Sequence, residues 1–209
     1  MQWSIAYERR GPTRSGLTGG GATGNTADMS LQKNVAGQNV GLTLSNAATN
    51  APFTGASFSG AAWIAKDGVQ SAFSGSFVEL SPTGKALYNY APTQAETNAN
   101  SIHLWVTPSG AVPTGLLFLT SGLHKNVSGQ GIAFGMMSEA GVPDPSATVT
   151  VTVWQDGGSL AAGGGTVSNL GHGQYDYPIP QAETNGANCN YSFSASGDVT
   201  VNYSIWTVP

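Results

Sequence analysis

One stretch of 11 residues occurs twice in this chain. Residues 88–98 read Tyr-Asn-Tyr-Ala-Pro-Thr-Gln-Ala-Glu-Thr-Asn, and residues 175–185 read Tyr-Asp-Tyr-Pro-Ile-Pro-Gln-Ala-Glu-Thr-Asn, 87 positions later. The shared positions include Tyr88, Tyr90, Gln94, Glu96 and Asn98, with the counterparts Tyr175, Tyr177, Gln181, Glu183 and Asn185. An internal repeat means that each copy is one structural unit. The 209 residues therefore predict two domains of about 85 residues each.

Each copy has the features of a corner between two β-strands. The Tyr-x-Tyr pattern puts two aromatic rings on one face of a strand, and the following proline ends that strand. Thr93 and Glu96 fit the capping box of a one-turn helix, whereas Pro180 replaces the threonine in the second copy. A repeated acid could also ligate calcium or act as a general acid. We interpret Glu96 and Glu183 as structural capping residues.

The rest of the pattern predicts an all-β protein. Residues 40–44 and 102–106 alternate apolar side chains with others, which is the period of a strand. The Asp-Gly pairs at 67–68 and 156–157 indicate tight hairpin turns, which need positive φ. The chain shows no helical stripe longer than one turn. We predict two tandem small antiparallel β-sandwich domains of immunoglobulin-like type, without the cysteine pair of antibody domains.

The predicted boundaries are residues 1–36 for an N-terminal arm, 38–121 for the first sandwich, 122–130 for a linker and 131–209 for the second sandwich. The arm begins with alternating residues typical of a strand and continues into a glycine-rich stretch. Its strand could add to the edge of a sheet in the first domain or in a neighbouring subunit. The arm residues expected to contact partners are Trp3, Ile5, Tyr7, Arg9, Arg10 and Arg14.

Charged residues form only 9 % of the chain, against roughly 25 % in ordinary soluble domains. Such a weakly charged surface favours a subunit covered by other copies or by partners, so we expect a homo-oligomer. The net charge of -4, without a basic stripe after the first fourteen residues, argues against nucleic acid. No apolar signal segment or membrane-length apolar run occurs, so we expect synthesis in a cytoplasm and no membrane partner.

No catalytic or metal-binding constellation emerges from the sequence. Cys189 is the single cysteine, which excludes an intrachain disulfide and predicts a buried core thiol. His103, His124 and His172 lack metal-ligand spacing, and no strand-to-helix serine motif occurs. The glycine clusters are not followed by the residues of a phosphate-binding loop. We therefore predict a protein without enzymatic activity, cofactor or metal.

Four tryptophans in the predicted domains could pack in a core or interface, or could line a sugar-binding face. Trp154 precedes the second Asp-Gly turn, a position that suits a large core residue. Trp105 alternates with the apolar residues of its strand and so faces the other way. We predict Trp105 as an exposed aromatic that contacts a partner.

Three segments of the first copy carry a family resemblance. They are Trp-Ile-Ala-Lys-Asp-Gly at 63–68, Gly-Lys-Ala-Leu-Tyr-Asn-Tyr at 84–90 and Thr-Gln-Ala-Glu-Thr-Asn-Ala at 93–99. Together they resemble a pattern that recurs in structural proteins of tailed bacteriophages. The resemblance covers residues 40–121 well and 131–209 more loosely, since the second copy has Gln155 in place of Lys66. It implies a non-catalytic virion subunit present in several copies.

The resulting hypothesis is a capsid decoration or cement-type subunit, anchored through its arm to other virion proteins. Its location would be the virion, after assembly in the bacterial host cytoplasm. A tail, neck or baseplate subunit is the alternative within the same resemblance. A carbohydrate-binding or receptor-binding adhesin module, using an exposed aromatic such as Trp105, is the alternative from a different class.

Overall fold

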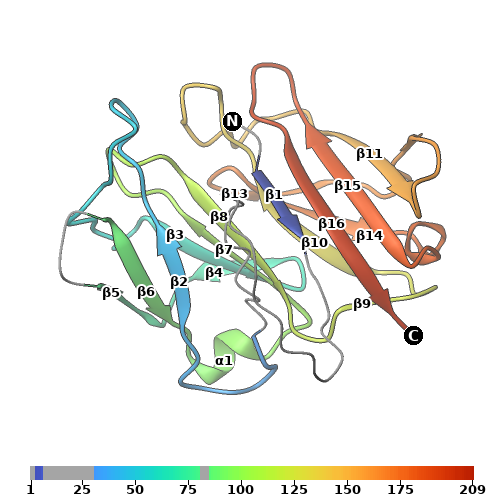
Figure 1. Ribbon diagram of the computed structural model, residues 1–209, viewed down its shortest axis with the longest axis horizontal. Coiled ribbons are helices and arrows are strands. Elements are labelled where there is room, and N and C mark those ends of the chain that lie inside the picture. The colour runs from blue at the N-terminus through green and yellow to red at the C-terminus, as the bar shows by residue number, and fades with distance from the viewer. Residues whose placement is uncertain (1–2, 7–30, 81–84) are drawn as a thin grey trace, which may run out of the picture.

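A computed structural model describes residues 3–6, 31–80 and 85–209 (Figure 1). This part of the chain is almost entirely β-structure, with one α-helical turn, α1 (Gln94–Thr97), and one 3-10 turn, η1 (Gln181–Thr184). The all-β sandwich prediction is therefore confirmed. The strands are β1 Trp3–Ala6, β2 Val40–Thr43, β3 Ala62–Lys66, β4 Val69–Ala72, β5 Ser76–Glu79, β6 Leu87–Ala91, β7 Ser101–Val106, β8 Thr114–Leu119, β9 Leu123–His124, β10 Gln130–Gly135, β11 Thr150–Gln155, β12 Ala161–Ala162, β13 Ser168–Gly171, β14 Gln174–Ile179, β15 Asn188–Ser194 and β16 Val201–Val208.

The described strands form four sheets, two for each copy of the repeat. The first copy contains the sheets β2-β6-β5 and β4-β3-β7-β8. The second contains β10-β14-β13 and the sheet β1-β16-β15-β11-β12, in which β9 also pairs with β16. All pairings are antiparallel except those of β1 and β9, which run parallel to β16. The corner turns α1 and η1 each connect the two sheets of one copy.

Alternating side chains fill one apolar core in each copy. In the first, Leu42 and Tyr90 from one sheet face Ile64 and Leu104 from the other. The second core is formed by the equivalent residues of β10, β11, β14 and β15. It also buries Cys189, as predicted for a core thiol. Because successive side chains of a strand point to opposite faces of its sheet, one half of them enters the core and the other half lies on the outer face. What covers that other set differs between the two copies.

The sandwiches pack against each other through the sheets β4-β3-β7-β8 and β10-β14-β13, as the centre of Figure 1 shows. Every residue of β7 is buried, so both faces of its sheet are covered. Glycine makes this approach possible, because a Cβ on Gly135 of β10 would overlap the ring of Trp105. The two copies therefore share a close interface that contains almost no room for larger residues.

A second repeated segment was missed in the sequence analysis. Residues 31–38 read Leu-Gln-Lys-Asn-Val-Ala-Gly-Gln, and residues 123–130 read Leu-His-Lys-Asn-Val-Ser-Gly-Gln, 92 positions later. The predicted boundaries put residues 31–36 in the arm, Gln38 at the start of the first sandwich and residues 123–130 in the linker. Leu31 lies instead in the first core and Leu123 in the second. Residues 31–36 and 122–130 are therefore parts of the two sandwiches, and a self-comparison of the sequence would have shown this.

The glutamine that ends this second repeat folds its segment into a compact loop. The Gln38 side-chain amide donates to the carbonyls of Gln32 and Val35, each at 2.8 Å. Gln130 donates in the same way to the carbonyls of His124 and Val127, at 2.7 and 3.0 Å. The loop also contains an asparagine with φ near +60° in both copies, a conformation that asparagine tolerates better than most residues. The identity of the segment is thus explained by local hydrogen bonding.

Candidate functional site

The acid of the first corner is a capping residue, as predicted. Glu96 accepts from the Thr93 backbone N–H at 2.7 Å, and the Thr93 hydroxyl accepts from the Glu96 N–H at 3.3 Å, which completes a capping box. The Tyr90 hydroxyl and the Ser74 N–H also donate to the carboxylate, at 2.6 and 2.5 Å. Burial by itself would raise the pKa of Glu96, but these hydrogen bonds outweigh it and lower the pKa. The carboxylate is an internal structural group.

The prediction that Glu183 caps the second corner is wrong, because Pro180 has no N–H to donate and the Glu183 carboxylate bonds to other parts of the second sandwich. The Tyr177 hydroxyl donates to Glu183 at 2.7 Å, and the Gly164 N–H donates to it at 2.6 Å. Pro180 makes no side-chain capping bond, and a 3-10 turn replaces the α-helical one. Neither repeated glutamate therefore presents a free carboxylate toward a calcium ion or a substrate.

The Asp-Gly hairpins are tied to the corners in both copies. Asp67 accepts from the N–H of Ser101, the first residue of β7, at 2.8 Å. Asp156 accepts from the N–H of Asn188, the first residue of β15, also at 2.8 Å. Positive φ at both aspartates fits the predicted turn. These side chains fix where the strand after each corner begins.

The departure of the second copy at Gln155 does not change the local contact. Lys66 donates from Nζ to the Ala95 carbonyl of α1 at 3.0 Å. Gln155 donates from Nε2 to the Ala182 carbonyl of η1 at 2.9 Å. Both side chains therefore link the hairpin to the corner, and the lysine charge is not needed for this role.

The sequence prediction for Trp105 is wrong. Its side chain is only 1 % exposed, and its Nε1 donates to the His172 carbonyl at 2.9 Å. The alternation correctly put Trp105 on the outer face of its sheet, but the second sandwich covers that face. Trp154, predicted for the core, is instead half-buried on an outer face. Among the four tryptophans at positions 63, 105, 154 and 206, Trp206 has the largest exposed fraction, 47 %.

Polar side chains also cross the interface between the sandwiches. His103 of β7 is fully buried, and Gln174 Nε2 lies 2.7 Å from its Nδ1. Gln70 of β4 in turn donates to Gln174 Oε1 at 2.6 Å. Burial lowers the pKa of His103 to about 3, so the ring is neutral at pH 7. This network positions the two sandwiches and offers no accessible acid or base.

Asp176 of β14 is the charged group most affected by the interface. It is 8 % exposed, and its Oδ1 has no hydrogen-bond partner in the described part of the chain. Burial, followed by the negative charge of Asp67, raises its pKa to about 6. The carboxylate faces Gly68 in the first hairpin, where a Cβ would lie 2.8 Å from Oδ2. No room for a substrate is left beside it.

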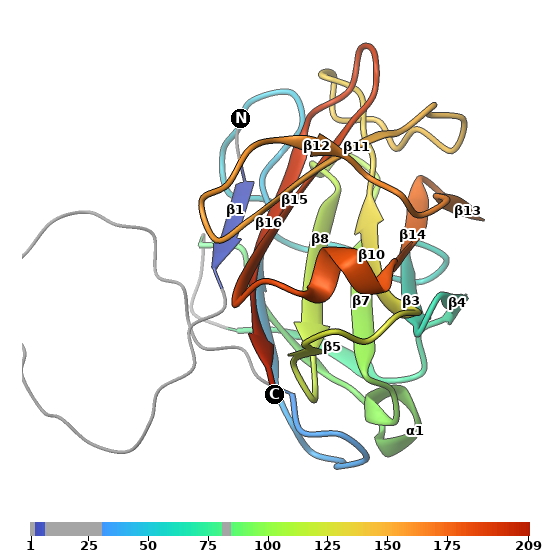
Figure 2. The ribbon, with the colours of Figure 1, turned by 90° about the vertical axis from the view of Figure 1, so that its right-hand side faces the viewer.

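The N-terminal strand lies at the edge of the second sandwich. β1 pairs in parallel with β16, with Trp3 opposite Val201 and Ala6 opposite Ser204, and Figure 2 shows the two strands side by side. Farther along β16, β9 pairs with Thr207 and Val208. The prediction that the arm adds to a sheet edge in the first domain is thus wrong, and the neighbouring-subunit alternative stays untested. The other predicted arm residues, Tyr7, Arg9, Arg10 and Arg14, lie outside the described residues.

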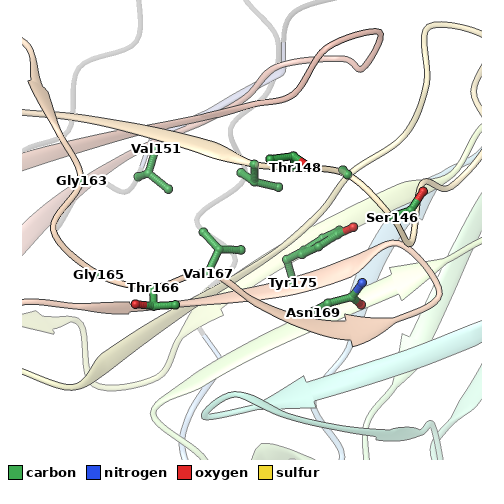
Figure 3. Close-up of a pocket in the computed structure, with 11 residues that line it drawn as sticks. Ser146, Thr148, Val151, Gly163, Gly165, Thr166, Val167, Asn169 and Tyr175 are labelled. Atoms are coloured by element: carbon green, nitrogen blue, oxygen red, sulfur yellow. The ribbon is translucent and has the colours of Figure 1, made fainter.

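A pocket with a volume of about 500 Å³ opens on the second sandwich between the segment that leads into β11 and the segment of residues 163–169 (Figure 3). Val151 and Thr148 project from one side toward Val167 and Tyr175 on the other. The Tyr175 hydroxyl donates to the Asp144 carbonyl at 2.9 Å. The eleven lining residues include no carboxylate, histidine, lysine, arginine or thiol, and their polar side chains are the hydroxyls and amide of Ser, Thr, Tyr and Asn residues.

Residues 3–6, 31–80 and 85–209 show neither a cluster of metal-ligand side chains nor a membrane-length helix. No group of three or more histidine, cysteine, aspartate or glutamate side chains is arranged to hold a metal ion. Over the same residues, the helices are too short and too polar to cross a membrane.

Comparison with known proteins identifies no family. No family model matches the sequence, and no curated protein matches it. One solved structure, an endo-fucoidan hydrolase from glycoside hydrolase family 107, is similar over 88 % of this chain and 33 % of its own length. The identity is 11 % and the TM-score 0.23. The chain thus spans about one third of that protein, and a likeness this weak carries no conclusion about fold or function.

Proposed function

We propose that the protein is a non-enzymatic structural subunit of a bacteriophage virion that joins neighbouring subunits through β1. The observation that carries the assembly role is the parallel pairing of this short N-terminal strand with the edge strand β16. Main-chain pairing at a sheet edge does not depend on particular side chains, so one subunit can supply the strand to another. The virion assignment itself rests on the sequence resemblance.

The chemistry of the described residues supports a non-catalytic role. The acids with the most altered environments are both buried, Glu96 in a corner and Asp176 in the interface between the sandwiches. Capsid decoration is the station that we propose, with a tail, neck or baseplate position as the other outcome of the same experiment. Low charge and many polar neutral residues suit a subunit surrounded by copies or by other virion proteins.

Cysteine pairs can test whether β1 is exchanged between subunits. Ser4 and Asn202 are register partners, and Cys189 is buried and out of reach. We expect the S4C/N202C protein, incorporated into particles and oxidised, to form covalent chains of two or more subunits. A single S4C variant is the control. Disulfides found only within single chains would overturn strand exchange.

Incorporation into particles tests the anchoring role. Ile5→Pro removes a backbone donor in β1, whereas Ile5→Val leaves the backbone able to pair. We expect I5P and a deletion of residues 1–30 to lose incorporation by at least tenfold, with I5V unchanged. Electron microscopy of the particles would then place the subunit on the head or the tail. Normal incorporation of the deletion variant would refute the anchor.

A further inference from the structure

The outer face of β11, β15 and β16 combines two tryptophans with small polar side chains. Their burial patterns alternate, so the inward residues fill the second core and the outward ones stay half-buried or exposed. The outward residues are serine, threonine and asparagine together with two tryptophans and Val208, and none of them is charged. Those that matter below are Trp154, Trp206, Asn188, Asn190, Ser192 and Ser204. In Figure 1 these three strands lie side by side at the right.

The tryptophans stand where the first copy has smaller residues. In the register of the first sheet Ala65 lies opposite His103, and in the second Trp154 lies opposite Asn190, so Trp154 takes the place of Ala65. By the same comparison, Trp206 takes the place of the buried Leu119. The aromatic rings are therefore not inherited from the face that packs between the sandwiches.

The two interface tryptophans of the first copy are absent from the matching positions of the second copy. Trp63 lies opposite Trp105 in the first sheet, and Thr152 lies opposite Ser192 at the matching register of the second. Both rings that the second sandwich covers are thus replaced by small hydroxyl residues. A face without these apolar anchors does not suit another sandwich module, and polar outer faces are typical of terminal repeats.

Hydrogen bonds hold the amides of this face in place. Asn190 Nδ2 donates to Asn188 Oδ1 at 2.5 Å, and Asn188 Nδ2 donates to Ser204 Oγ at 3.3 Å. Asn190 Oδ1 accepts no hydrogen bond from the described residues. Ordered amide and hydroxyl groups beside an exposed ring provide donors and acceptors at fixed positions.

We propose that this face binds a neutral oligosaccharide, which stacks on Trp206 and Trp154 and hydrogen-bonds with the asparagines between them. Sugar rings combine apolar C–H faces with hydroxyl groups, and a tryptophan ring beside amide groups matches both properties. The two Trp Cα atoms are two strands and two residues apart, roughly 12 Å, so one sugar ring cannot contact both. The absence of charge on the outward residues favours a neutral ligand over an anionic one.

This inference does not depend on the virion assignment, and it replaces Trp105 as the candidate sugar-contacting aromatic. The test uses the full chain and an array of neutral oligosaccharides of two to six sugar units, followed by titration of the best ligand with tryptophan fluorescence as readout. We expect binding of the longer oligosaccharides, and a loss of affinity of at least tenfold in Trp206→Ala. Trp154→Ala should show a similar loss.

Two further variants separate binding from folding and from self-association. Val78→Ala removes an exposed apolar side chain, 56 % exposed, from a different sheet, and it should bind as the unchanged protein does. Asn190→Ala should bind the oligosaccharide more weakly than the unchanged protein. Its thermal unfolding midpoint should stay close to that of Asn188→Ala. Absence of binding to every oligosaccharide would overturn the inference. So would concentration-dependent self-association that W206A abolishes, since the face would then contact a second copy.

Discussion

The strands β7 and β15 occupy equivalent places in the two sandwiches, yet their surroundings differ. Both follow a corner with the same Gln-Ala-Glu-Thr-Asn sequence, and both begin at an N–H bound by the aspartate of a hairpin. In β7 every residue is buried, whereas in β15 buried and half-buried residues alternate. The corner thus specifies the sandwich, and the outward residues of the strands specify what lies against it.

The difference teaches how a repeated unit acquires two roles. Trp105 of β7 packs under Gly135 of the second sandwich, but its counterpart Ser192 faces outward. A single change of side chain at an outward position leaves the sandwich core untouched, because that core is built from the alternate residues. One copy can therefore serve as a docking platform and the other as an outer surface.

The largest expected effect comes from removing the interface ring. Trp105→Ala should lower the free energy of unfolding by about 3–5 kcal/mol, because a fully buried aromatic is lost and the Nε1 bond to His172 with it. Denaturant titration measures the change. Ser192→Ala is the matched control and should stay within about 0.5 kcal/mol. Equal losses in both variants would contradict the assignment of one face as covered and the other as open.

The next effect compares the two corner acids. Glu96→Gln should lower stability by about 2–3 kcal/mol at pH 7, since a buried carboxylate with several donors is neutralised. Glu183→Gln, with fewer donors and more exposure, should cost about 1 kcal/mol. Both are measured by urea unfolding with unchanged slopes.

The pH dependence of the Glu96 pair follows from the pKa direction. The pKa of Glu96 is lowered in the folded state, so its contribution is present above the unfolded value of about 4.3 and is lost as pH falls through the folded value. The gap between the unchanged protein and E96Q should therefore shrink in acid. A gap that is constant from pH 3 to pH 7 would show that the carboxylate charge is not what matters.

A gain in stability, in place of a loss, is expected from removing the charge of the interface carboxyl group. The counterpart of Asp176 in the first copy is Asn89, which lies on an uncovered face of its sheet. Asp176→Asn therefore gives both copies the same neutral residue at this position. The pKa of Asp176 is about 6 in the folded protein and about 3.9 in the unfolded chain. The stability of the protein therefore falls as the pH rises from about 3.9 to about 6, and it stays lower above that range. D176N should therefore gain about 2 kcal/mol at pH 7 and almost nothing near pH 3.5.

The reverse substitution sharpens the same comparison. Asn89→Asp places a carboxylate on the outward side of β6. The native Asn89 side chain is half-exposed there, and its Nδ2 donates to Asn39 Oδ1 at 2.8 Å. It should change stability by less than about 0.5 kcal/mol at pH 7. Thermal unfolding at both pH values measures the pair. A pH-independent D176N effect would show that burial between the sandwiches does not perturb the carboxyl group.

Local patterns predicted the elements that depend on local contacts. The capping box at Thr93, the Asp-Gly hairpins and the strand alternation each rest on residues close in sequence or on backbone conformation, and the structure confirms them. The loop of residues 31–38 was missed although its repeat was visible, because its role is a side-chain-to-backbone network without a familiar strand or helix signature. The boundary of the arm was misplaced for that reason.

Predictions about exposure failed where a distant part of the chain decided the outcome. The alternation of side chains along a strand assigns a residue such as Trp105 or Trp154 to one of the two faces of its sheet. It does not show whether another part of the chain covers that face. Trp105 is buried by strands more than twenty residues away, and Trp154 is left open because no sandwich follows on that side in the described chain. Trp105 is consequently closed to solvent, whereas Trp206 is 47 % exposed.

The sequence by itself determined the all-β class, the corner with its capping acid, and the duplication of one unit. These follow from backbone preferences and from hydrogen bonds between residues a few positions apart. Only the tertiary structure decided which outer face is covered, where β1 pairs, and which tryptophan meets solvent. The physical reason is that burial of a sheet face and pairing of a sheet edge depend on surfaces brought together from across the chain, whose glycines and large rings must fit.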